Sequence, residues 1–199
     1  MLSLKEKVRL LLENLSLEVE RGVRCLEVVK AIKFADPREE VRDESAFFIT
    51  VDEACQRGAL LSLAKLVIAE KESVSVDYLL NCALEVPSKA FPHASREMLE
   101  AAVSGHRSQL AGLETLSEDL KARRDRMLAH LDRKHVNAPE ALPSGAIDLK
   151  VIEEGYETVS EIINAYRGYF GMPALSLEEM RAGIIEEVAE LADCVRHKA

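Results

Sequence analysis

Hydrophobic residues recur every three or four positions along most of the chain, which is the period of an amphipathic α-helix. The period is clearest over residues 4–34 and 149–170. Its members are Val8, Leu11, Leu15, Val19, Leu26 and Val29 in the first stretch, and Ile152, Tyr156, Val159, Ile163, Tyr166 and Phe170 in the second. No segment keeps the alternation of a β-strand. The pattern therefore predicts an all-α protein.

Helix breakers and capping residues divide this pattern into elements. Asp36-Pro37 ends the first helix, because the residue before a proline avoids helical backbone angles. Asp148 and Ser176 are predicted N-caps, and Ser176 has Glu179 three residues on as a capping box. The predicted helices cover about residues 4–34, 44–70, 76–84, 93–135 and 149–170, with a last helix after residue 176 and a loop over about 136–147.

The long helix predicted over residues 93–135 leads into the most unusual part of the chain. Its apolar row is Met98, Ala102, His106, Leu110, Leu113 and Leu120. His106 within such a row is interpreted as a hydrogen-bonded core histidine rather than as a metal ligand. Gly105 and Gly112 are positions at which this helix could bend.

Composition agrees with one helical bundle of about five main helices, formed by residues 1–199 as a single domain. Hydrophobic residues make up 48% and charged residues 31% of the chain, as in soluble globular proteins. No apolar run approaches the length of a membrane span. Four scattered cysteines without metal-type spacing are typical of reduced thiols, so we expect a cytoplasmic protein without membrane contact.

Positive charge is concentrated in one segment, Lys121–His135, of a chain whose net charge is −9. An acidic chain is not expected to coat nucleic acid over its whole surface, so RNA contact is expected here alone. The candidate phosphate-steering residues are Lys121, Arg123, Arg126, Arg133 and Lys134. The alternative interpretation of these side chains is a solvated surface.

Arg124 is the anomaly within this segment. Helical spacing places it in the middle of an apolar row formed by Leu113, Leu116, Leu120, Met127 and Leu131. An arginine at such a position is costly unless a carboxylate, a carbonyl or a phosphate meets it. It is therefore interpreted as a buried or interface salt bridge, as a side chain that extends to solvent, or as a phosphate ligand.

Arg124-Asp125, four further residues and His130 resemble the arginine-polar-spacer-histidine motif of the HEPN superfamily (higher eukaryotes and prokaryotes nucleotide-binding). The run Arg-Asp-Arg-Met-Leu-Ala-His-Leu-Asp is similar to its abortive-infection, AbiU-like branch. The segments 60–65, 69–73 and 74–80 are similar to the second helix of that branch and the segment after it, although Lys65 stands where an arginine is expected. The resemblance covers most of residues 40–170.

The resemblance implies a HEPN-like bundle and a metal-independent endoribonuclease that acts as a toxin or phage-defence effector. It assigns proton transfer to His130 and stabilisation of phosphate charge to Arg124, while Asp125 would orient either of them. It implies no cofactor and no metal. The alternatives are a non-catalytic module that binds nucleotide, RNA or protein, and a purely structural helical dimer.

A metal centre is disfavoured by the residues themselves. Carboxylate metal sites in helical bundles need Glu-x-x-His pairs on facing helices, and none of the five histidines has a glutamate three residues before it. Asp132-x-x-His135 is the nearest pattern, and it occurs once.

The spacing of the motif points to a homodimer. Six residues separate Arg124 from His130, which is about 120° around a helix, so one regular helix does not aim both at one phosphate. Two chains meeting around a dyad would bring both motifs to one cleft, and the apolar setting of Arg124 suggests burial against something other than its own core. The resemblance also implies sites at dimer interfaces and a nucleotidyltransferase-type antitoxin as a partner.

Overall fold

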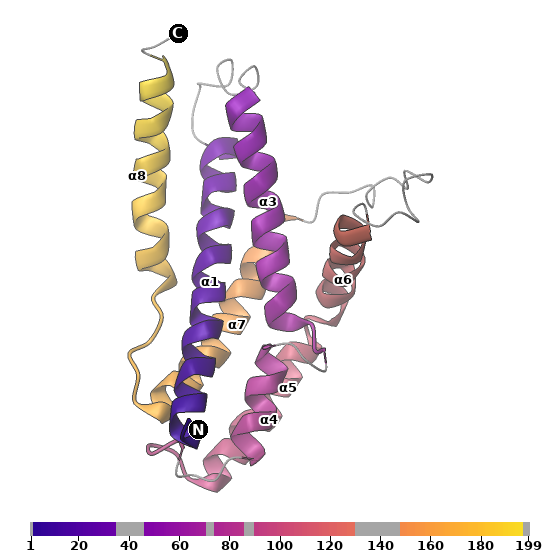
Figure 1. The fold of residues 1–199 in the computed structure, drawn as a ribbon, viewed down its shortest axis with the longest axis vertical. Coiled ribbons are helices and arrows are strands. Elements are labelled where there is room, and N and C mark those ends of the chain that lie inside the picture. The colour runs from indigo at the N-terminus through magenta and orange to yellow at the C-terminus, as the bar shows by residue number, and fades with distance from the viewer. Residues whose placement is uncertain (1, 35–45, 71–73, 86–89, 130–147, 197–199) are drawn as a thin grey trace.

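The computed structural model describes residues 2–34, 46–70, 74–85, 90–129 and 148–196. Within these ranges the chain forms seven helices and no strand, so the predicted all-α class is confirmed (Figure 1). The helices are α1 (Leu4–Phe34), α3 (Ala46–Val67), α4 (Val76–Glu85), α5 (Arg96–Ala111), α6 (Glu114–Ala129), α7 (Leu149–Phe170) and α8 (Leu177–Arg196). Their number is somewhat above the five expected.

The 31-residue helix α1 is the element on which the others pack. Figure 1 shows α3 on one side of it, α8 on the other and α7 crossing behind. Its six predicted core residues, Val8, Leu11, Leu15, Val19, Leu26 and Val29, are each at most 7% exposed. The helical period therefore identified the buried face of α1 correctly, and burial of that face is what holds the bundle together.

Helix α7 supplies the largest side chains of the core. Tyr156 and Tyr166 are fully buried, and the Tyr156 hydroxyl donates a 2.6 Å hydrogen bond to the Ala59 carbonyl oxygen of α3. His106 Nδ1 lies 3.2 Å from the Tyr166 hydroxyl, which confirms His106 as a hydrogen-bonded histidine at the core edge. Gly171 ends α7 in the left-handed region, at φ 87°, where a glycine has no steric penalty.

The prediction of one continuous helix over residues 93–135 is wrong. This stretch consists of α5 and α6, separated at Gly112, whose N–H bonds the carbonyls of Ser108 and Gln109 in a tightened last turn. Helix α5 also begins later than predicted, because Ser95 is its N-cap and accepts a hydrogen bond from the Met98 N–H. Residues 130–135 of the predicted helix lie outside the described residues.

The predicted apolar row of α5 is partly displaced. Met98 is 49% exposed, whereas Leu99 and Val103 are each 2% exposed. The buried positions follow the face that α5 turns to α4 and α7, on which Leu99, Val103 and His106 lie at helical spacing. Which of two adjacent rows of a helix is buried depends on the neighbouring helices. A periodic pattern in the sequence does not specify those neighbours.

Both predicted N-caps are confirmed. The Asp148 side chain accepts from the Lys150 N–H at 3.0 Å, and the Ser176 hydroxyl accepts from the Glu179 N–H at 3.1 Å. Across the described ranges, no helix combines the length and hydropathy needed to cross a bilayer.

Candidate functional site

Helix α6 carries the described part of the basic segment and lies against α3. Leu116 and Leu120 anchor it, with exposed fractions of 6% and 1%, and Leu113 just before it is partly buried. These three residues confirm the N-terminal half of the predicted apolar row. The side chains of Met127 and Leu131, which would continue the row, lie outside the described set.

Arg124 is held at the edge of α6 by two carboxylates. Its Nη2 lies 2.7 Å from Glu70 Oε1 and 2.8 Å from Asp125 Oδ1, and its Nε donates to the same Asp125 oxygen at 3.0 Å. Its side chain is 18% exposed. The hydrogen bond to Asp125 raises the pKa of the Arg124 guanidinium most, and the hydrogen bond to Glu70 raises it next. The group therefore carries its charge at any physiological pH.

These contacts give Arg124 a partner that the sequence did not reveal. Glu70 belongs to its own chain and follows α3 directly, so the half-buried position of Arg124 requires no second copy. Arg124 therefore forms a salt bridge within its own chain, and its burial does not by itself indicate a second copy, while its role as a phosphate ligand stays a prediction. In the sequence, Glu70 stands out only by its place in the polar stretch 69–73 that precedes the segment 74–80.

Asp125 contacts Arg124 as expected of an orienting residue, and its side chain is 54% exposed. Lys121 is exposed on α6, and Arg123 is half-buried. Arg123 also lines a small pocket of about 200 Å³ between α6, α3, α1 and the start of α7.

The rest of the predicted site is not described. Arg126 lies within α6, but its side chain is outside the described set, as are the whole residues His130, Arg133 and Lys134. The structure therefore brings Arg124 and Asp125 together, and the distance from Arg124 to His130 stays a prediction.

The described residues provide neither a metal site nor a reactive thiol. In the described part of the chain, no three His, Cys, Asp or Glu side chains gather as a metal site. Cys25, Cys55 and Cys82 are free, and burial raises the pKa of the Cys55 thiol to about 11. A protonated thiol is a poor nucleophile and a poor metal ligand.

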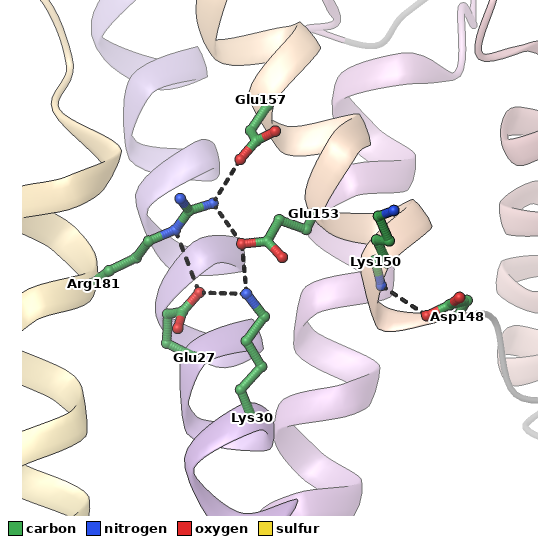
Figure 2. A network of polar contacts seen from close by, with 7 residues as sticks. All are labelled: Glu27, Lys30, Asp148, Lys150, Glu153, Glu157 and Arg181. Atoms are coloured by element: carbon green, nitrogen blue, oxygen red, sulfur yellow. Dashed lines mark hydrogen bonds and ion pairs between the residues drawn. The ribbon is translucent and has the colours of Figure 1, made fainter. Parts of the chain in front are cut away.

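A second charged cluster lies between α1, α7 and α8 (Figure 2). Arg181 reaches Glu153 at 2.9 Å, Glu157 at 3.3 Å and Glu27 at 3.4 Å. Lys30 contacts Glu27 at 3.1 Å and Glu153 at 2.6 Å. Every charge in the cluster has an opposite partner, so its evident role is to fasten α8 to the bundle. The sequence did not predict it, because its members come from three different helices.

The chain matches a known family of helical proteins. A family model described as AbiU2, of the HEPN type, matches residues 5–179. The chain belongs to the AbiU2 family. The match covers most of the chain and includes the whole Arg124–His130 motif, which confirms the resemblance to the AbiU-like branch of HEPN proteins. No curated protein and no solved structure matches the chain.

Membership in the AbiU2 family makes this chain a HEPN-type module of the abortive-infection class. The described half of its motif offers one permanently charged guanidinium at the protein surface, with two exposed carboxylates against it. Such a group can bind a phosphate when the anion displaces a carboxylate, or it can remain a salt bridge between α6 and the end of α3.

Proposed function

We propose that this AbiU2-family chain is a metal-independent endoribonuclease that acts as a toxin or phage-defence effector. One observation carries the proposal: Arg124, oriented by Asp125, stands at the surface edge of α6, six residues before His130 in a HEPN-type motif. RNA supplies its own nucleophile, the 2′-hydroxyl, so the protein has to supply proton transfer and a cation.

His130 transfers the proton in the proposed reaction, since an unperturbed imidazole has a pKa of about 6.5. The 2′-oxygen attacks the adjacent phosphorus, the bond from phosphorus to the 5′-oxygen breaks, and the proton passes to the leaving oxygen. Arg124 binds the phosphoryl oxygens, on which negative charge grows, through its forked donors. Asp125 keeps the guanidinium plane in place while this happens.

In this reaction the phosphate has to replace the Glu70 carboxylate as a partner of Arg124. The Glu70 side chain is 49% exposed, so its ion pair with Arg124 is partly solvated and contributes little to stability. A phosphate offers several anionic oxygens and competes with such a carboxylate. Lys121, Arg123, Arg126, Arg133 and Lys134 would draw the RNA backbone to the segment from an otherwise acidic protein.

The runner-up is a module that binds nucleotide, RNA or protein without cleavage. The observation that favours it is that Arg124 already has two carboxylate partners, as a structural arginine would. The purely structural dimer remains the third candidate.

An RNA-cleavage assay in EDTA separates these functions. We expect the purified chain to cleave RNA, and His130→Ala and Arg124→Lys to lower the rate by about a hundredfold or more, because a lysine does not fork two hydrogen bonds to one phosphate. Arg96→Lys is the matched control, since Arg96 also pairs with a carboxylate, Glu100, on an exposed helix outside the motif.

The melting temperatures of all variants have to be measured in parallel. Loss of cleavage at unchanged melting temperature supports the catalytic assignment. Binding of RNA without cleavage by the wild type would establish the runner-up, and a lysine variant as active as the wild type would reduce Arg124 to general charge steering.

The proposed activity implies a location, an oligomeric state and a partner for the chain. The chain would act on cytoplasmic RNA as a homodimer, and a nucleotidyltransferase-type antitoxin would restrain it. Co-expression with a nucleotidyltransferase-type antitoxin should restore growth that the chain alone inhibits, and the His130→Ala chain should not inhibit growth.

A further inference from the structure

An open apolar groove of about 450 Å³ runs along α1 between α3 and α8, away from the basic segment. Figure 1 shows the two helices that form its walls on opposite sides of α1. Its floor and walls are Val28 and Ile32 of α1, Phe47, Phe48, Val51 and Cys55 of α3, and Met180, Ile184 and Val188 of α8. Phe47 is 51% exposed, so the groove presents apolar surface to solvent.

The lining residues are spaced at intervals of one helical turn on all three helices. Val28 and Ile32 are four residues apart on α1, as are Val51 and Cys55 on α3 and Ile184 and Val188 on α8. Such i, i+4 rows form the ridges between which a further helix packs. From Met180 to Val188 the groove wall is about 12 Å long, which matches the span of about two turns over which a bound helix places its i, i+4 and i+7 anchors.

The groove is preformed rather than a gap beside a loose helix. Arg181, one residue after the wall residue Met180, fastens α8 through its contacts with Glu27, Glu153 and Glu157. These ion pairs hold the α8 wall beside α1 in the folded chain.

The rim of the groove is acidic. Glu179 and Glu187 line it from α8, both are exposed, and neither has an ion-pair partner within the described residues. Among the described lining residues, Arg24 is the only basic one, and Glu20 neutralises it at 2.7 Å. Over its full length α8 has six acidic and two basic residues, so the field at the groove is negative.

We propose that this groove is a docking site for a basic amphipathic helix of a partner protein. The apolar face of that helix would fill the three-walled groove, and its Lys or Arg residues would meet Glu179 and Glu187. The same negative rim repels RNA, an anionic membrane and the matching face of a second copy. The inference is independent of the proposed ribonuclease activity, because the groove contains no residue of the motif.

A defined probe tests this chemistry without knowledge of the natural partner. A fluorescent Leu/Lys peptide with a helical apolar face should bind the full chain, and more weakly as salt is raised, whereas a Leu/Glu peptide of the same pattern should not bind. Two neighbouring pairs on α8 supply matched variants. Ile184 lines the groove and Ile185 does not, being 56% exposed; Glu187 lines it and Glu186 does not.

Ile184→Asp and Glu187→Lys should each weaken peptide binding by roughly tenfold or more, while Ile185→Asp and Glu186→Lys leave it within about threefold. Glu187→Lys changes an exposed residue, so it keeps the test informative even if Ile184→Asp lowers stability. Equal effects within a pair, equal binding of the Leu/Glu peptide, or no binding of the Leu/Lys peptide would overturn the proposal. So would self-association that Ile184→Asp abolishes, because it would place a second copy in the groove.

Discussion

At the scale of single residues, Gly22 shows how closely the core is built. It lies in the middle of α1, where the Tyr156 side chain of α7 passes directly over it. A Cβ built at Gly22 would fall 1.8 Å from the Tyr156 hydroxyl oxygen and 2.3 Å from the ring carbon that bears it. A glycine in a helix costs stability, and here its cost is offset by a close approach that no other residue permits.

Gly22→Ala should therefore lower the free energy of unfolding by roughly 2–4 kcal/mol, because Tyr156 has to shift and lose its hydrogen bond to Ala59. Gly105→Ala is the control within another helix. A Cβ at Gly105 meets nothing within 4 Å, so this substitution should raise stability by about 0.5–1 kcal/mol. Urea unfolding of both variants measures the two changes, and a Gly22→Ala protein as stable as the wild type would contradict the packing described for Tyr156.

Arg124 shows that a charged side chain in an apolar row also depends on one specific neighbour. Its position in an apolar row was visible as an anomaly, and a single carboxylate from outside its helix, Glu70, accounts for its tolerance. A residue that is costly alone is tolerable in a pair, and that pair leaves the guanidinium charged and near solvent.

At the scale of elements, α8 differs from the other helices in how it is attached. None of its described residues belongs to the fully buried core, and only Leu177 and Met180 at its start pack against that core. Arg181 supplies the remaining attachment by contacting Glu27, whose side chain is 5% exposed, together with Glu153 and Glu157 (Figure 2). A helix with no fully buried side chain among its described residues is expected to open locally before the core does.

Arg181→Met should release α8 while leaving the rest of the bundle folded. The substitution keeps most of the side-chain length but removes the charge. Among the described residues Glu27 then keeps only Lys30 as an ion-pair partner, so local stability falls by about 1–3 kcal/mol. Amide hydrogen exchange should quicken in α8 and stay unchanged in α1 and α7. Arg96→Met, which breaks an exposed i, i+4 pair on α5, should leave α8 protected; unchanged α8 exchange in Arg181→Met would assign its attachment to Leu177 and Met180 instead.

At the scale of the whole molecule, charge is divided between an acidic body and one basic segment. The net charge of −9 keeps two copies apart over most of their surface, whereas the motif segment has six Lys or Arg against two Asp. Two such segments that meet would repel each other unless carboxylates or a phosphate lie between them. Asp125 and Glu70 are carboxylates already placed at Arg124.

The active form is expected to be a two-fold dimer that joins the Lys121–His135 segments. The reason is geometric: Arg124 and His130 diverge by about 120° on a regular helix, so a single chain offers an incomplete pair. Inorganic phosphate or RNA should strengthen the dimer by screening the basic segments. Light scattering over a dilution series, with cleavage measured on the same samples, tests this, and a dilute monomer with full activity would exclude a shared site.

The sequence by itself determined the helical class, the buried faces of α1 and α7, and the caps at Asp148 and Ser176. These features depend on contacts within a few residues along the chain, namely the helical repeat and the hydrogen bonds of a helix end. The motif from Arg124 to His130 was visible for the same reason, because its residues lie on one short segment.

Only the tertiary structure decided the choice of Leu99 over Met98, the pairing of Arg124 with Glu70, and the attachment of α8 through Arg181. Each of these depends on which helices become neighbours, and a helical period does not contain that information. Arg181 and Glu27 lie more than a hundred residues apart in the chain, yet their charges meet because α1 and α8 pack side by side. The period along a helix shows which face is buried, whereas the packing of the helices determines what that face meets.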